Sequence, residues 1–357
     1  MNPEFWAGKR VFLTGHTGFK GSWLALWLTQ LGAEVVGFAL PPATSPSLAE
    51  ALALDRHIFG SRHGDINDRG ALESAVRQAA PEIVLHLAAQ ALVRPSYETP
   101  VETFSTNIMG TVHLLEAVRR TPSVRAVVLV SSDKCYENQE WAWGYREDDP
   151  LGGHDPYSAS KGAMEIVSAA YRRSFLAERG VGVATARAGN VIGGGDWSVD
   201  RIVPDLARAF SSGATAVIRR PRAVRPWQHV LEPLAGYLLL AERLWQEPAR
   251  FASAWNFGPD SRDTRTVRDL TTLFAAAWGD RGRWACDEEQ ASLHEATTLR
   301  LDSSRARAEL SWRPHWTFEQ AVAGTAAWYL SFYRDPRPAA VLQETVTMIH
   351  RYCTGNV

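Results

Sequence analysis

The sequence predicts an α/β protein built on a doubly wound parallel sheet, and three observations support this fold class. Short apolar runs rich in valine, leucine and isoleucine alternate with longer segments of helical apolar spacing. Three glycines spaced three residues apart, Gly15, Gly18 and Gly21, join the first apolar run to the first helical segment. Polar residues follow the apolar run 127–130, at the edge where a parallel sheet carries its ligand sites.

The alternation can be followed element by element along the first two thirds of the chain. Strands are expected at 11–14, 34–40, just before Gly64, 83–89, 127–130 and 181–187. Helices are expected over 23–31, 72–78, 107–120, 157–178 and 233–244. The tryptophans at helix-like positions, such as Trp23 and Trp27, are expected in the core rather than on a base-stacking surface.

The rhythm of strands and helices weakens after Gly189, and a cluster of arginines follows between Arg219 and Arg225. We therefore expect a dinucleotide-binding domain over 1–189, with a return segment at about 226–260. A smaller, interleaved C-terminal domain for the substrate is expected to consist of 190–225 and 261–357.

The composition describes a globular chain with balanced charge. The 357 residues are 45% hydrophobic, and 38 basic residues stand against 39 acidic ones. A net charge near zero argues against nucleic acid or an anionic membrane as the partner. The N-terminus lacks the apolar core of a signal peptide, so we expect a cytoplasmic protein. Cys135, Cys286 and Cys353 lie far apart without metal-ligand spacing, so no metal site is expected.

The glycine-rich turn is expected to bind a dinucleotide. Glycines allow the close approach of a pyrophosphate, and the following helix N-terminus offers free N–H groups. In such a Rossmann arrangement an acid usually follows the second strand and bonds the adenosine ribose. Here Leu40-Pro41-Pro42 stands at that place, so the choice between NAD and NADP stays open. Lys20, inside the turn, is a candidate for meeting a 2′-phosphate.

Tyr157 and Lys161 are four residues apart on an expected helix, which places both side chains on one face. An ammonium group beside a phenol favours the phenolate. A tyrosine that loses its proton near neutral pH is a general base for an alcohol, which is the proton half of hydride transfer. Ser132, Asp133 and Lys134 follow the strand expected at 127–130, where a parallel sheet places catalytic groups.

Eight segments carry a specific combination of motifs. They lie at 15–23, 88–97, 132–136, 143–147, 152–158, 187–197, 225–230 and 255–259. Among them are Gly-His-Thr-Gly-Phe-Lys-Gly-Ser-Trp, Ser-Asp-Lys-Cys-Tyr and Arg-Pro-Trp-Gln-His-Val. Together they resemble, over almost the whole chain, the extended short-chain dehydrogenase/reductase family, and within it the CDP-D-glucose 4,6-dehydratases. The pair Asp133-Lys134 is the sharper mark, since related dTDP-glucose and GDP-mannose dehydratases carry Asp-Glu at the matching place.

The resemblance implies a lyase with an internal redox cycle. Tyr157, with Lys161 and Ser132, would take the proton of the carbon-4 hydroxyl of CDP-glucose while hydride passes to NAD. Asp133 would then protonate the departing carbon-6 hydroxyl, and Lys134 would either remove the carbon-5 hydrogen or only orient a hydroxyl. Hydride would return to carbon 6 and regenerate NAD.

The resemblance also implies the binding residues. For the cofactor these would be Gly15, Thr17, Gly18, Phe19, Lys20, Gly21, Asp65, Ile66, Leu87, Ala88, Ala89, Asn107, Tyr157 and Lys161. The sugar nucleotide would contact Gln90, Arg94, Asn190, Arg201, Arg219, Arg225 and His229. Family members pair the helices corresponding to 107–120 and 157–178 between subunits, which implies a homodimer or a tetramer.

Two other interpretations stay open from the sequence. One is another sugar-nucleotide dehydratase or an epimerase on the same fold, although the pair Asp133-Lys134 favours the elimination of water. The other is a non-catalytic NAD-binding sensor, against which the retention of Ser132, Tyr157 and Lys161 argues.

Overall fold

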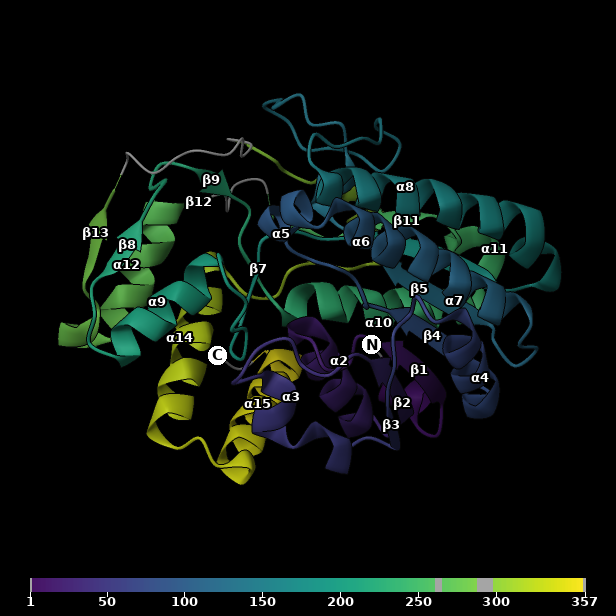
Figure 1. Cartoon of the computed structure of the whole chain (residues 1–357), viewed down its shortest axis with the longest axis horizontal. Coiled ribbons are helices and arrows are strands. Elements are labelled where there is room, and N and C mark those ends of the chain that lie inside the picture. The colour runs from purple at the N-terminus through teal and green to yellow at the C-terminus, as the bar shows by residue number, and fades with distance from the viewer. Residues whose placement is uncertain (1, 261–264, 288–297, 356–357) are drawn as a thin grey trace.

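Seven parallel strands form the central sheet of the computed structural model, which describes residues 2–260, 265–287 and 298–355 (Figure 1). Their order is β11-β6-β5-β4-β1-β2-β3. The strands are β1 (Arg10–Thr14), β2 (Glu34–Ala39), β3 (Gly60–His63), β4 (Ile83–His86), β5 (Ala126–Val130), β6 (Gly182–Arg187) and β11 (Ala254–Asn256). Every neighbouring pair in this sheet is parallel, which confirms the predicted α/β fold class.

The strand order reverses between β1 and β4. The chain runs outward from β1 through β2 to β3, and then continues on the other side of β1 with β4, β5 and β6. Thr14 and His86, at the ends of β1 and β4, are register partners. The loops that follow these two strands therefore flank the crevice in which open sheets of this kind bind their ligands.

Helices cover both faces of the sheet (Figure 1). One face carries α4 (Arg69–Ala79), α7 (Gly110–Arg119) and α8 (Pro156–Tyr171), which contact one another in this order. The other face carries α2 (Phe19–Gln30) and α10 (Leu231–Gln246), and α10 packs against β5 and β6. Because both faces are covered, every residue of β4 and β5 is buried; β5 is a continuous apolar run in the sequence, and β4 is apolar up to His86.

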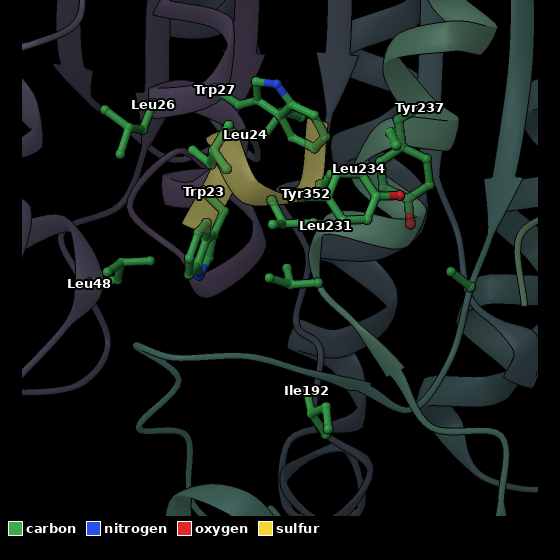
Figure 2. Packing of buried hydrophobic residues seen from close by; sticks show 14 of the residues in the cluster. Trp23, Leu24, Leu26, Trp27, Leu48, Ile192, Leu231, Leu234, Tyr237 and Tyr352 are labelled. Atoms are coloured by element: carbon green, nitrogen blue, oxygen red, sulfur yellow. The ribbon is translucent and has the colours of Figure 1, made fainter. Parts of the chain in front are cut away.

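The largest buried cluster surrounds α2 and extends into α10 and α15 (Pro338–Thr354) (Figure 2). Trp23 and Trp27 are 0% and 1% exposed, as predicted. Trp23 Nε1 donates to Gly194 O at 2.9 Å, and the Tyr352 ring meets Trp27 edge-on at 5.6 Å. A helix that is apolar on several sides is stable only when it is enclosed. This enclosure fixes α2, and with it the glycine-rich turn at its N-terminus.

The second half of the chain adds a smaller group of elements beside the sheet (Figure 1). Its helices are α9 (Ile202–Ser211), α12 (Val267–Ala277) and α14 (Phe318–Arg334). Three two-stranded pairs accompany them, namely β7 (Val191–Ile192) with β10 (Gln228–His229), β8 (Ala216–Ile218) with β13 (Trp284–Cys286), and β9 (Val224–Arg225) with β12 (Arg265–Thr266). Between these segments α10 and β11 return to the parallel sheet.

Short helices complete the connections. They are α1 (Pro3–Trp6), α3 (Leu48–Leu52), α5 (Val93–Glu98), α6 (Pro100–Phe104), α11 (Pro248–Phe251) and α13 (Ser304–Glu309). The C-terminal helix α15 packs against α2 and α3. Within the described ranges, no helix is both long and apolar enough to cross a membrane.

Candidate active site

The glycine-rich turn leaves backbone free for a ligand between β1 and α2. Gly15 has φ +77°, and a Cβ there would lie 2.7 Å from the Ala88 nitrogen. A Cβ on Gly21 would lie 2.0 Å from the Gly15 oxygen, so glycine is required at both positions. Helix α2 begins at Phe19 without a side-chain cap on its N-terminal N–H groups. This turn therefore fits a dinucleotide pyrophosphate.

A pocket of about 320 Å³ lies beside this turn, near the carboxyl ends of β2 and β3. Thr17, Pro41, Pro42, Asp55 and His63 are among its lining residues. Asp55 and His63 were missed in the sequence, because Asp55 comes from a 3₁₀ turn well outside the strand end where an acid is usual. The signal for His63 was its position at the end of a short strand. The pocket lies where the adenosine of a dinucleotide is expected to bind in this type of sheet.

Lys20 faces the other end of the crevice. Its ammonium group interacts with the charges of Arg201, Asp133 and Lys161, and burial lowers its pKa to about 8. Lys20 is not among the residues that line the pocket beside Thr17, and its contact with a 2′-phosphate stays a prediction.

Asn107 lies in a π turn, η2 (Ser105–Met109), that precedes α7. Its amide donates to Gln90 O at 3.0 Å and to Ser160 Oγ at 2.8 Å, and it accepts from Gln90 N at 2.9 Å. Asn107 thereby holds the loop after β4 against α8. On the other side of this loop, Thr14 Oγ1 accepts from the N–H groups of Leu87 and Ala88, each at 3.2 Å. The segment from Leu87 to Gln90 is thus fixed along the crevice.

Asp65 and Ile66 follow β3, as predicted. Asp65 Oδ1 accepts from Asn67 N at 2.9 Å and from Asn67 Nδ2 at 3.1 Å. Ile66 is buried against Gly110, where a Cβ would lie 2.4 Å from its Cδ1. These contacts fix the backbone of the turn at the adenosine side.

Ser132, Asp133 and Tyr157 converge where β5 ends and α8 begins. The Ser132 hydroxyl donates to Asp133 Oδ1 at 3.0 Å, and its influence lowers the pKa of the Tyr157 phenol. Asn190 Nδ2 donates to Asp133 Oδ2 at 3.3 Å. Gly189 makes room for this carboxylate, since a Cβ there would lie 1.9 Å from Asp133 Oδ2. The structure therefore brings Tyr157 close to Ser132 and Asp133, which are consecutive in the sequence.

Burial dominates the electrostatics of Tyr157 and Lys161. Burial raises the pKa of Tyr157 to about 12, although the Ser132 hydroxyl opposes this shift. Lys161 Nζ donates to Val130 O at 3.2 Å, and burial lowers the pKa of Lys161 to about 8. Desolvation of the phenolate outweighs the pKa-lowering influences of Ser132 and Arg201, so the role of Lys161 in activating Tyr157 stays a prediction.

Lys134 is half-buried beside Asp133 in a 3₁₀ turn, η3 (Asp133–Cys135). Its N–H donates to Ser132 Oγ at 3.2 Å, which caps the turn. Consecutive residues of a 3₁₀ turn project roughly 120° apart. Asp133 and Lys134 therefore extend in different directions from one short turn.

Arg94 and Arg219, two of the predicted substrate residues, meet on one carboxylate. Arg94 Nη1 and Arg219 Nη2 donate to Asp200 Oδ1 at 3.1 and 3.2 Å. Arg94 comes from α5 and Arg219 follows β8, so Asp200 connects the two parts of the chain.

The other predicted substrate residues are half-buried or buried, namely Gln90, Arg201 and Arg225. Arg201 Nη1 donates to Asp196 Oδ2 at 3.0 Å, and its positive charge acts on Tyr157. Gln90 is half-buried, and its Nε2 donates to Leu92 O at 3.0 Å. Arg225 is 9% exposed on β9.

His229 is wrongly assigned to the substrate by the motif in which it lies. It is 0% exposed, and its ring packs 6.0 Å from Trp23 and 4.6 Å from Trp316. Burial lowers the pKa of His229 to about 3, and its Nδ1 accepts from Leu231 N at 3.3 Å. His229 is therefore a neutral core residue that supports α2 from below the crevice.

Comparison with known proteins identifies relatives over nearly the whole chain. The model of the family described as GDP-mannose 4,6 dehydratase matches residues 12–325. The chain is 50% identical over 339 residues to CDP-glucose 4,6-dehydratase of Salmonella typhimurium, with 94% of each chain covered. It is 28% identical over 336 residues to dTDP-glucose 4,6-dehydratase of Xanthomonas campestris pv. campestris, covering 89% of this chain and 92% of that one.

Solved structures show the same fold. The dTDP-glucose 4,6-dehydratase of Bacillus anthracis in complex with NAD aligns with a TM-score of 0.76 at 20% identity, covering 92% of this chain and 99% of that one. The resemblance drawn from the sequence motifs is confirmed by these matches. This chain belongs to the GDP-mannose 4,6 dehydratase family, a branch of the extended short-chain dehydrogenases/reductases.

Proposed function

We propose that this protein is a lyase that converts CDP-D-glucose to CDP-4-dehydro-6-deoxy-D-glucose in an internal redox cycle with NAD. The convergence of Ser132, Asp133 and Tyr157, with Lys134 beside them, carries this proposal. The similarity to a CDP-glucose 4,6-dehydratase, at 50% identity over 94% of the chain, supports this substrate. An epimerase needs no acid and base for eliminating water, so Asp133 and Lys134 favour the dehydratase.

NAD is the cofactor that fits the crevice. The backbone between Gly15 and Gly21 and the N-terminus of α2 would bind its pyrophosphate, and the pocket beside Thr17 would take its adenosine. That pocket is lined by two carboxylates, from Glu50 and Asp55, and by one arginine, Arg56. The excess of negative charge disfavours the 2′-phosphate of NADP. When bound, NAD supplies a hydride acceptor and a positively charged ring.

Tyr157 would act as the base for the carbon-4 hydroxyl. Ser132 would donate to the same oxygen and orient it between the two side chains. Burial raises the pKa of Tyr157 to about 12. Because the chain by itself favours the neutral phenol, the phenolate would form only in the loaded site, where the additional positive charge lies close by. Loss of hydride and of the hydroxyl proton would leave a ketone at carbon 4.

The ketone makes the carbon-5 hydrogen acidic, and the turn η3 would then serve the elimination. Asp133, buried and bonded to Asn190, would protonate the departing carbon-6 oxygen. Lys134, projecting from the same turn in another direction, would take the carbon-5 proton. The hydride returned to carbon 6 and a proton returned to carbon 5 would complete the product and leave NAD unchanged.

Basic side chains support a nucleoside diphosphate at the outer end of the site. Arg94 and Arg219 already converge on an anionic oxygen, that of Asp200, and Arg201 and Arg225 lie on the same part of the chain. Guanidinium groups bind phosphate oxygens in fixed geometry. We propose that the substrate diphosphate takes the place of the Asp200 carboxylate between Arg94 and Arg219.

Exposed apolar side chains support a homodimer. Val101, Met109, Ile166 and Phe175 are 73%, 45%, 62% and 46% exposed. They lie on α6, on η2, on α8 and on the π turn that follows α8, and α6 and α7 both pack against α8. A cluster of large apolar side chains at the surface marks an interaction site. Two copies would pair through these helices in a four-helix contact, from which a tetramer can be built.

A panel of sugar nucleotides tests the proposed activity. The protein would be incubated with NAD and with CDP-, dTDP-, UDP- or GDP-linked hexoses, and the alkaline chromophore of 4-keto-6-deoxy products would be recorded. We expect many turnovers with CDP-glucose and no net consumption of NAD. Turnover of another sugar nucleotide in place of CDP-glucose would reassign the substrate. Binding of NAD without any turnover would favour the sensor.

A further inference from the structure

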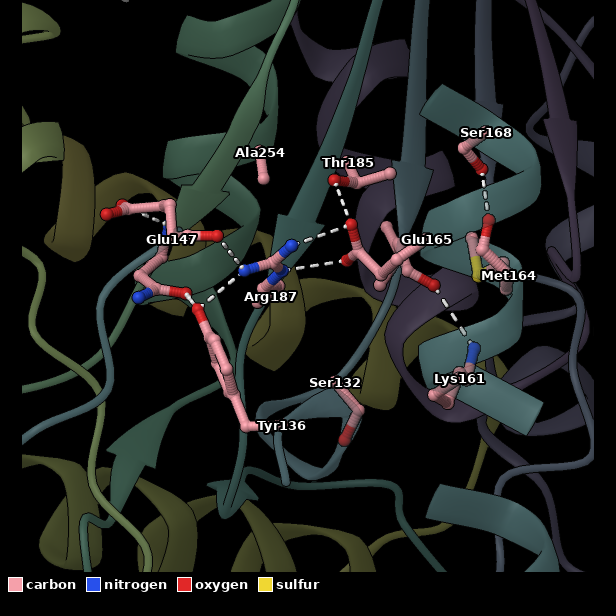
Figure 3. A network of polar contacts seen from close by, with 12 residues as sticks. Ser132, Tyr136, Glu147, Lys161, Met164, Glu165, Ser168, Thr185, Arg187 and Ala254 are labelled. Carbon is pink, nitrogen blue, oxygen red and sulfur yellow. Dashed lines mark hydrogen bonds and ion pairs between the residues drawn. The ribbon is translucent and has the colours of Figure 1, made fainter. Parts of the chain in front are cut away.

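Glu165 and Arg187 form an ion pair that is almost excluded from water behind the reaction centre (Figure 3). Each side chain is 3% exposed. Arg187, on β6, donates from Nε and Nη2 to the two Glu165 oxygens at 2.9 Å each, and Thr185 Oγ1 donates to Glu165 Oε2 at 2.6 Å. The net stability from such a pair is small, because desolvation of the two charges offsets their attraction. The role of this ion pair is therefore sought in the residues next to Glu165 and Arg187.

Glu165 acts on Lys161, which lies one turn earlier on α8. Lys161 is 4% exposed, and its Nζ donates to Val130 O. Burial lowers the pKa of Lys161, and the Glu165 carboxylate is the strongest influence that opposes this shift. Without Glu165 the buried ammonium group would keep the Val130 carbonyl oxygen as its hydrogen-bond partner and lose this favourable charge.

Three other titratable groups interact with Lys161 from neighbouring elements. Burial raises the pKa of Cys135, in η3, and lowers that of His86, on β4, to about 3, so both are neutral near pH 7. Lys20, in the first turn of α2, adds a positive charge that opposes protonation of Lys161. Glu165 is therefore the group in this set that favours the charged form of Lys161.

Arg187 reaches the other half of the reaction centre. Its Nη1 donates to Tyr136 Oη at 2.7 Å and to Glu147 O at 2.8 Å, and its guanidinium lies 4.8 Å from the Tyr136 ring centre. Tyr136 follows directly on the turn η3 that carries Asp133. The Tyr136 phenol in turn donates to Asn256 Oδ1 at 2.8 Å. One guanidinium thus fixes the end of the turn on which the acid and the base lie.

We propose that Glu165 and Arg187 are positioning residues for the dehydration, with Glu165 acting through Lys161 and Arg187 acting through Tyr136. The inference rests on the proposed function, since it gives the pair a part in that reaction. Glu165 keeps a charged ammonium group on the helix face of Tyr157. Arg187 holds η3 in place relative to this helix. Because Glu165 and Arg187 bind each other, the position of α8, which carries the groups for the first hydride transfer, is fixed relative to η3, which carries the groups for the elimination.

Glu165→Gln tests the first half, since it keeps the shape and removes the charge. We expect the alkaline limb of the kcat profile to move by about one pH unit to lower pH. The KM for CDP-glucose and the Kd for NAD should stay near the wild-type values, and the rate should recover as the pH is lowered. Glu165→Asp retains the charge and should leave the limb near its wild-type position. Glu242→Gln is the matched control, because this buried carboxylate accepts from Trp6 Nε1 at 2.7 Å, away from the site.

Unfolding measured against pH gives a readout that does not depend on turnover. The pKa of Lys161 is about 8 in the fold against an ordinary value of 10.5, so the unfolded chain binds more protons between these values. Stability therefore rises with pH as Lys161 loses its proton in the fold. In Glu165→Gln this rise should begin at lower pH than in the wild type. If the wild type fails to convert CDP-glucose, the proposed function fails, while this profile still decides whether Glu165 controls Lys161.

Tyr136→Phe tests the second half by removing the hydroxyl between Arg187 and Asn256. We expect kcat to fall by about tenfold or more, with reduced nicotinamide accumulating during turnover, because η3 serves the elimination and not the first transfer. The alkaline limb should stay in place. An unshifted limb and an unshifted stability profile in Glu165→Gln would overturn the role of Glu165. A fall in rate without reduced nicotinamide in Tyr136→Phe, or no fall, would overturn that of Arg187.

Discussion

Removal of the Ser132 hydroxyl should displace the acid limb of the pH–rate profile. Tyr157 must lose its proton to act, and burial alone raises its pKa to about 12. The Ser132 hydroxyl is the strongest influence that opposes this increase. Ser132→Ala therefore makes the phenolate harder to form, and the limb should move to higher pH.

The size of the displacement follows from the strength of the lost interaction. A hydrogen bond to a charged group contributes about 1.5–3 kcal/mol. One pKa unit corresponds to about 1.4 kcal/mol, so the limb should move up by about one to two pH units. At a pH on this limb, kcat should fall by about 10- to 100-fold and should be regained as the pH is raised.

The assay is kcat against pH at saturating NAD and CDP-glucose. Ser132 also donates to Asp133 and caps Lys134, and loss of these contacts would lower kcat by the same factor at every pH. Only the loss of the hydroxyl's influence on the Tyr157 phenol moves the limb. Ser168→Ala is the control, since this buried serine lies on α8 with Tyr157 and donates to Met164 O at 2.7 Å. A limb that stays in place would refute this account of Tyr157.

Four further variants test other parts of the account. Tyr157→Phe should lower turnover by about 10²-fold or more while NAD still binds, and near-normal activity would remove Tyr157 from the mechanism. Gly15→Ala should abolish NAD binding with an unchanged circular dichroism spectrum, because its Cβ would lie 2.7 Å from the Ala88 nitrogen; retained binding would contradict the pyrophosphate site. Lys134→Met should accumulate reduced nicotinamide, whereas full turnover would leave Lys134 as an orienting group only. Ile166→Glu should give monomers in sedimentation, and an unchanged dimer would place the interface elsewhere.

The fold could be predicted because its main signals are local. A parallel strand that is buried on both faces is an unbroken apolar run, as at Ala126–Val130. The glycine-rich turn and the helical apolar spacing are equally short-range. The π turn at Ser105–Met109 was not predictable, because apolar spacing does not distinguish it from the first turn of a helix. It is fixed by the tertiary contacts that Asn107 makes with Gln90 and Ser160.

The residues that meet at the candidate active site could be predicted from the sequence, but their pKa values could not. Ser132, Asp133 and Tyr157 are brought together as expected, since strand ends and helix starts meet at the carboxyl edge of the sheet. The pKa of Tyr157 depends on desolvation, which is a property of the folded chain and of no single motif. His229 shows the same limit, because its burial is decided by Trp23 and Trp316 from distant segments.

The orientation of individual side chains in the fold also could not be predicted from the sequence. Lys20 lies within the glycine-rich motif, and its place in the sequence suits either end of a dinucleotide. The packing of α2 turns it toward Asp133 and Arg201. The pair of Glu165 and Arg187 was likewise invisible, since only the fold brings β6 beneath α8.

In the proposed reaction, hydride leaves carbon 4 and returns to carbon 6 of the same sugar. CDP-glucose carrying deuterium at carbon 4 should therefore give a product with deuterium in its methyl group, and a mixture of labelled and unlabelled substrates should show little crossover. In deuterated water, the product should also gain deuterium at carbon 5. Deuterium appearing in free reduced cofactor, or one equivalent of NAD consumed per product, would contradict the internal cycle and make the protein a simple oxidoreductase.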